Sequence, residues 1–140
     1  MPRFCLRWLC ALVIGASVVM SVQATEAYRC HSIHNPDEKQ FCLATIKNEN
    51  YRCHSVRNDD LRNRCLAMTR GETYRCHNIR DDDDRNACLG LTKGESYRCH
   101  NIRDPDDRHL CLAEVKGERY RCHNIRDPDT KARCLASVGR

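Results

Sequence analysis

The feature that most constrains this chain is a regular 23-residue repeat. The tetrapeptide Tyr-Arg-Cys-His begins at Tyr28, Tyr51, Tyr74, Tyr97 and Tyr120, and in every copy a second Cys follows the first after 12 positions. The five units span residues 28–50, 51–73, 74–96, 97–119 and 120–140 and leave no linker between them. A unit this short cannot bury an apolar face alone, so it packs on its neighbours. The repeat therefore predicts a single repeat domain over residues 25–140.

The second half of each unit carries the start and stop signals of a helix. An Asn or Asp suited to cap a helix N-terminus occupies one fixed place in every unit: Asn35, Asn58, Asp81, Asp104 and Asp127. An Asp in the first turn, favourable with the helix dipole, also recurs in every unit: Asp37, Asp60, Asp83, Asp106 and Asp129. The residues suited to end the helix are Gly71, Gly94, Gly117 and, in the first unit, Asn48. Each unit is thus expected to hold a helix of about 12 residues, such as Pro105–Lys116.

The apolar spacing indicates which side of this helix is buried. In the fourth unit the buried stripe comprises Cys111, Leu112 and Val115, with Leu110 and Ala113 beside it. A basic residue four positions after the cap is expected on the solvated side: Lys39, Arg62, Arg85, Arg108 and Lys131.

The first half of each unit predicts a short helix of one or two turns, with an extended segment as the alternative. Asn50, Thr73 and Ser96 are candidate caps just before it. Each unit then becomes a helical hairpin, and the predicted fold class is an all-α, small disulfide-stapled α-solenoid of five 23-residue hairpins.

Residues 1–24 have the features of a signal peptide. Arg3 and Arg7 form a basic start, residues 8–22 are apolar, and the small-residue end resembles a cleavage site after Ala24. The alternative is a membrane anchor, but an apolar run of about 15 residues falls short of the roughly 20 that span a bilayer. We therefore expect export, to the periplasm or the medium, and no membrane span after cleavage. The exported chain would keep ten of the 12 Cys in an oxidising compartment.

Periodicity leaves two regular ways to pair these ten Cys. Pairing between units, as in Cys42 with Cys53, strands Cys30 and Cys134 at opposite ends. Pairing within units uses all ten, and we favour it: Cys30–Cys42, Cys53–Cys65, Cys76–Cys88, Cys99–Cys111 and Cys122–Cys134. In the chain-entropy model a loop this short contributes roughly 2 to 3 kcal/mol per bridge, which compensates for a small core.

No catalytic constellation stands out from the repeat. The sequence has no G-x-S-x-G element and no phosphate-binding Gly-rich loop, and every Cys has a periodic partner, so the prediction is a protein that is not an enzyme and has no cofactor. A metal site is disfavoured because equivalent His in stacked units lie too far apart to share an ion. The local exception is His31 with His34, at i and i+3 of an expected helix, which could form a weak surface site.

The recurring Arg of the tetrapeptide provides a candidate binding face: Arg29, Arg52, Arg75, Arg98 and Arg121. A solenoid would align them on one surface, facing an unknown protein or an anionic polymer of the cell envelope. Loss of Arg3 and Arg7 with the signal would lower the net charge from +5 to +3, and export excludes nucleic acid as the default partner. The recurring Tyr is expected to be partly buried between units. The function predicted is a binding scaffold; the alternative is a metal-binding or buffering protein that uses reduced Cys and His.

The units, with Cys30, Ile33, Cys42 and Leu43 in the first, resemble those of uncharacterised exported, cysteine-rich tandem-repeat proteins of bacteria (C-x2-I/V-x8-C-L-A). The likeness covers residues 28–138. It implies a helical, disulfide-linked repeat protein of the cell envelope and transfers no catalytic residue.

Overall fold

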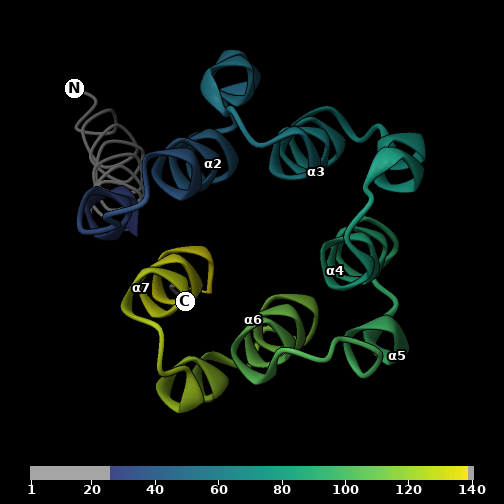
Figure 1. The fold of residues 1–140 in the computed structure, drawn as a ribbon. Coiled ribbons are helices and arrows are strands. Elements are labelled where there is room, and N and C mark those ends of the chain that lie inside the picture. Colours follow the sequence, from purple (N-terminus) through teal and green to yellow (C-terminus); the bar gives the residue numbers. More distant parts are fainter. Residues whose placement is uncertain (1–25, 139–140) are drawn as a thin grey trace, which may run out of the picture.

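The computed structural model describes residues 26–138, and this part of the chain is helical and contains no strand (Figure 1). The long helices, one per unit, are α2 (Pro36–Lys47), α3 (Asp59–Arg70), α4 (Asp82–Lys93), α6 (Pro105–Lys116) and α7 (Pro128–Ser137). The short helices between them are η1 (Asn50–Ser55), η2 (Thr73–Asn78), α5 (Ser96–Cys99) and η3 (Arg119–Asn124). Residues 26–31 are the helical part of the first unit that precedes α2. The hairpin units predicted from the sequence are confirmed.

The signal peptide predicted for residues 1–24 lies outside the described residues. Between residues 26 and 138, no helix has the length and apolar character needed to cross a membrane.

The ends of the long helices are set by the residues that the sequence indicates. The side chains of Asn35 and Asp104 each accept hydrogen bonds from two backbone N–H groups of the first turn, and the other three units have an equivalent cap. Gly71, Gly94 and Gly117 end their helices with φ near 70°, a left-handed conformation that favours Gly. The predicted caps of the short helices are wrong. Asn50, Thr73 and Ser96 are the first helical residues, and the preceding Glu residues make no capping hydrogen bond.

The five units form a closed ring. Figure 1 shows the long helices end-on around a common centre, with the short helices on the outside. Each long helix packs on the next, and α7 packs on α2, so the fifth unit meets the first. The predicted stack of hairpins placed Cys30 and Cys134 at opposite ends, and this part of the prediction is wrong because the stack closes on itself in the structure.

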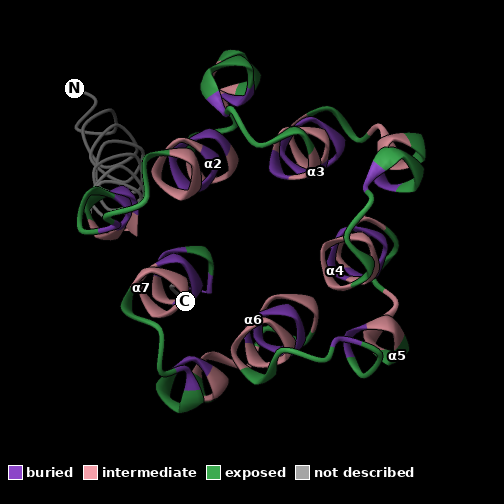
Figure 2. Cartoon of the chain, in the orientation of Figure 1, coloured by how far each residue is buried: buried purple, intermediate pink, exposed green. Residues whose placement is uncertain are grey.

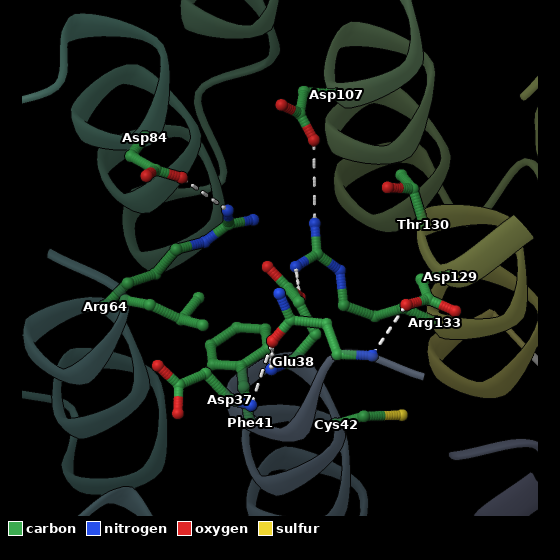
Figure 3. Close-up of polar contacts among 12 residues, drawn as sticks. Asp37, Glu38, Phe41, Cys42, Arg64, Asp84, Asp107, Asp129, Thr130 and Arg133 are labelled. Atoms are coloured by element: carbon green, nitrogen blue, oxygen red, sulfur yellow. Dashed lines mark hydrogen bonds and ion pairs between the residues drawn. The ribbon is translucent and has the colours of Figure 1, made fainter. Parts of the chain in front are cut away.

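One hydrogen-bonding arrangement recurs at all five joints of the ring. The first-turn Asp of one unit accepts hydrogen bonds from the two backbone N–H groups that precede the next long helix. Asp37 accepts from Arg57 and Asn58 at 3.1 and 2.9 Å. At the closing joint, Asp129 accepts from the N–H groups of His34 and Asn35 at 2.9 and 2.8 Å (Figure 3). Closure therefore uses the contact that joins consecutive units.

The disulfides lie within units and are buried. Cys30–Cys42 and its four equivalents have Cα–Cα distances of 5.5–5.6 Å, and all ten Cys are at most 1% exposed. This is the within-unit pairing of the two schemes that periodicity allows. The core continues across the joints, because Cys30, Ile33 and Leu43 of the first unit pack with Ala136 of the fifth.

The basic residues expected on the solvated side of the long helices have a further role. Arg62, Arg85 and Arg108 are half-buried, and each donates to a carbonyl oxygen in the segment before its own helix. Arg108 reaches the carbonyl of Ile102 at 2.8 Å. These side chains therefore hold the two halves of their hairpins together, and the prediction of a purely solvated position is wrong for them.

Candidate functional site: rim and axis of the ring

The short helices on the outside of the ring expose five Tyr side chains. Tyr28 is 75% exposed and its four equivalents are 58–61% exposed, and they are the exposed large hydrophobic residues of the described chain. Figure 2 shows exposed residues on the outer sides of these short helices. The expectation that Tyr is partly buried between units is therefore wrong. The Tyr rings meet solvent around the whole rim.

Each rim Tyr of units two to five is held in place by the Glu two positions before it and the Arg directly after it. In the second unit, the hydroxyl of Tyr51 donates to the carboxylate of Glu49 at 3.0 Å, and the guanidinium of Arg52 lies 5.3 Å from the ring centroid. Arg52 Nε also donates to Glu49. We call this Glu–Tyr–Arg group a rim site. It recurs with Glu72, Tyr74 and Arg75, with Glu95, Tyr97 and Arg98, and with Glu118, Tyr120 and Arg121.

In each rim site the Glu carboxylate neutralises the positive charge of the Arg. These Arg residues were predicted from the sequence to form a basic binding face. Hydrogen bonds from Arg52, Arg75, Arg98 and Arg121 hold the pKa of their partner Glu below its usual value. Each rim Arg is thus paired with a carboxylate three positions before it and stacked on Tyr. Arg29 is half-buried at the equivalent place in the first unit. Ring closure also places these Arg residues around the outside of the ring. They therefore do not line up on one surface, as expected for an open solenoid.

The His residues do not form the helical pair that the sequence suggested. The first helical segment ends at His31, so His34 lies beyond it, and the i, i+3 geometry assumed for a weak metal site is wrong. His34 instead takes part in ring closure, with Nδ1 3.0 Å from a carboxylate oxygen of Asp129. Among residues 26–138, no group of three or more His, Cys, Asp or Glu side chains is arranged to hold a metal ion.

The axis of the ring is filled by one residue from each long helix. We call these five equivalent residues the middle layer: Phe41, Arg64, Ala87, Leu110 and Arg133. All five are buried, at 1–3% exposure. The guanidinium groups of Arg64 and Arg133 each lie 5.4 Å from the centroid of the Phe41 ring, so the cations are packed on one aromatic residue (Figure 3). Phe41 and the two guanidinium groups therefore meet between the long helices near the centre of the ring.

Carboxylates one turn earlier in the helices neutralise the two buried cations. Arg64 lies 3.4 Å from Asp84, and Arg133 pairs with Glu38 and lies 3.7 Å from Asp107 (Figure 3). Burial raises the pKa of Asp84 and Asp107 above the usual value, and the nearby Arg residues oppose this shift. Three carboxylates thus share two guanidinium groups.

The sequence reasoning missed this axial charge cluster. The middle-layer position is Phe, Arg, Ala, Leu or Arg in the five units, so it lacks the regularity that marked the other sites. The sequence does contain one sign of this cluster. The position directly before the second Cys of each unit holds large apolar side chains in some units and charged side chains in others. Only a shared axis explains that mixture.

No protein-family model, curated protein or solved structure matches this chain. Fold and site together define a disulfide-rich, all-helical repeat protein with five units in a ring. Its five bridges indicate an oxidising compartment. They also engage the ten thiols that a Cys-based metal buffer would require as ligands.

Proposed function

We propose that this protein is a non-enzymatic, exported scaffold that binds a repetitive protein or polymer of the cell envelope through its rim sites. The observation that carries the proposal is the exposure of five equivalent Tyr rings, whereas the other large apolar side chains between residues 26 and 138 are buried or half-buried. The ring core does not need these five side chains for packing.

The rim sites are suited to binding because their Tyr rings are already ordered. One hydrogen bond and one cation–π contact restrain Tyr51, so fixing its rotamer on binding costs little conformational entropy. Tyr combines a large apolar surface with a polar tip, a combination enriched at binding surfaces.

Four equivalent rim sites on one rigid ring, with the exposed ring of Tyr28 as a fifth contact, favour a partner that offers several copies of the same small epitope. After one site binds, the others act at a high effective concentration, and weak contacts add up to firm attachment. The pairing of rim Arg with Glu makes aromatic contact, rather than a net positive field, the leading attractive interaction.

The test is a graded series in which Tyr is replaced by Ser in one, three or all five units. The readout is co-sedimentation of the purified, oxidised protein with envelope fractions of its source cell. Apparent affinity should fall stepwise, and the far-UV circular dichroism should stay unchanged because the replaced rings are exposed.

The matched control replaces the exposed His three positions further along the short helices by Ala: His54, His77, His100 and His123. This control should sediment like the wild type. A second variant carries Arg52→Ala, Arg75→Ala and Arg98→Ala and should bind less well, because the Tyr rings lose their support. If the five-Tyr variant co-sediments as well as the wild type, or if the wild type binds no envelope component, the proposal is wrong.

A further inference from the structure

The long helices place a third set of equivalent side chains one turn beyond the middle layer. These are Thr45, Met68, Leu91, Glu114 and Ser137. All five line one cavity of about 400 Å³, together with Ile46, Gly117 and Val138. Because each long helix contributes one equivalent residue, this cavity lies on the ring axis at the C-terminal ends of the helices. We call it the axial cavity, and its volume falls within the roughly 300–1,000 Å³ of small-molecule sites.

Apolar atoms form slightly more than half of the wall of the axial cavity. Met68, Leu91, Ile46 and Val138 supply aliphatic surface. The two hydroxyl groups are already engaged as donors within their own helices, since Thr45 donates to the carbonyl of Phe41 at 3.0 Å and Ser137 donates to the carbonyl of Cys134 at 3.2 Å. They therefore have no proton left for another acceptor in the wall.

Glu114 is the charged residue of this wall, and one of its oxygens lacks a partner. Its Oε2 atom is buried and accepts no hydrogen bond. The nearest cation is Arg133, whose charge attracts the Glu114 carboxylate through space, although its ion pairs run to Glu38 and Asp107 on the other side of the middle layer. A carboxylate oxygen shielded from water without a donor is costly, and a cationic donor entering the cavity would remove that cost.

The backbone adds to the negative character of the axial cavity. The five long helices end on the same side of the ring, so the C-terminal partial negative charges of four of them surround the axis. At the end of α7, the guanidinium of Arg119 donates to the carbonyl oxygens of Leu135 and Val138 and offsets that helix's charge. The basic residues of the last turns are exposed to solvent and do not line the cavity: Lys47, Arg70, Lys93 and Lys116. Water therefore screens the charges of these basic residues more strongly than it would screen the charge of a ligand inside the cavity.

We propose that the axial cavity binds a small organic monocation, namely an amine with an aliphatic or aromatic body. The ammonium group donates to the free oxygen of Glu114, and the apolar body contacts Met68 and Leu91. One carboxylate matches one positive charge, and the aliphatic wall excludes strongly hydrated metal ions, which need several oxygen ligands. This site is separate from the rim sites.

The experiment titrates the oxidised protein with 2-phenylethylammonium and, as the uncharged counterpart, with 2-phenylethanol, by isothermal calorimetry and ligand-observed NMR. The amine should bind, and the alcohol should bind at least about tenfold more weakly because it lacks the charged hydrogen bond. Glu114→Gln should reduce amine affinity by a similar factor. Glu118→Gln removes a carboxylate of the same charge from a rim site and should leave the affinity unchanged. Ser137→Phe fills the mouth of the cavity and should abolish binding of both probes.

The titrations are repeated with Arg140→Ala, because Arg140 follows the lining residue Val138 by two positions and carries the same charge as the probe. Binding by either the wild type or this variant, with the expected loss in Glu114→Gln, supports the proposal. If neither protein binds the amine, or if Glu114→Gln binds it as well as Glu118→Gln does, the proposal is overturned.

Discussion

Replacing Asp129 by Ala tests whether the ring closes in solution. In the closed ring this carboxylate accepts two backbone hydrogen bonds from residues 94 and 95 positions away, and its side chain is only 16% exposed. Asp106 makes the same two bonds at the joint between the fourth and fifth units, to the N–H groups of Arg126 and Asp127 at 3.1 and 2.8 Å. Both Asp residues follow a Pro at the start of a long helix, so Asp106→Ala is a matched control.

The expected cost of either substitution is about 2–3 kcal/mol in the free energy of unfolding. A hydrogen bond to a charged acceptor contributes about 1.5–3 kcal/mol, and two are lost, but the released N–H groups of exposed residues regain water and recover part of this. Loss of the favourable interaction with the helix dipole adds about 0.3–1 kcal/mol to both variants. The backbone hydrogen bonds are equivalent at the two joints, and Asp129 has in addition the contact with His34 Nδ1 at 3.0 Å, so Asp129→Ala should cost at least as much as Asp106→Ala.

Urea unfolding of the oxidised protein, followed by far-UV circular dichroism, measures both costs. Hydrogen exchange at the amides of His34 and Asn35 should be slow in the wild type and faster in Asp129→Ala. An open stack gives a different result: Asp129→Ala would be nearly silent while Asp106→Ala would retain its full cost. That outcome would refute the closed ring.

The same pair of variants has a defined pH dependence. Backbone hydrogen bonds from His34 and Asn35 lower the pKa of Asp129 below its ordinary value of 3.8, and equivalent bonds lower the pKa of Asp106. A lowered pKa in the folded state means that the stabilisation is present above the unfolded pKa and is lost as the pH falls through the folded one. The difference between wild type and Asp129→Ala should therefore be constant at neutral pH and shrink below pH about 4.

Three further outcomes follow from the structure. Gly90→Ala should raise the free energy of unfolding by about 0.5–1 kcal/mol, because Ala is the better helix former. The other four units hold Ala at this place, and the nearest atoms would lie 3.4 Å from the added Cβ. A loss of stability in urea unfolding would contradict this prediction. Arg133→Met should lower the free energy of unfolding by about 3–5 kcal/mol at neutral pH, because it leaves Glu38 and Asp107 without their shared cation. Thermal unfolding that matches the wild type would show that this pairing contributes nothing to stability. Alkylation of a chain of residues 25–140 without reductant should add no label, whereas reduction should expose ten thiols and abolish cooperative unfolding. A reduced chain that still melts cooperatively would show that the bridges are dispensable.

The local structure could be predicted from the sequence because short-range rules determine it. Capping residues such as Asn35 and Asp104, the Pro residues after them and the Gly that ends the helix act within one turn, and they located the long helices correctly. The period of 23 residues also determined that all units share one conformation. Pairing within units was favoured because, in a stack with free ends, pairing between units leaves Cys30 and Cys134 without partners.

Ring closure and the axial residues depend on how the units are oriented relative to one another. The angle between neighbours is set by many small packing contacts, and only its sum over five steps decides whether α7 returns to α2. The sequence showed Asp129 as a helix residue, but its partners are 94 and 95 positions away. Ring closure likewise brings Arg64 and Arg133 together on Phe41. It also decides that Glu114 faces a cavity shared by all five helices. The sequence by itself determined the repeating unit and its bridge, and the tertiary structure decided the ring, because local signals encode a turn of helix but not the accumulated rotation between units.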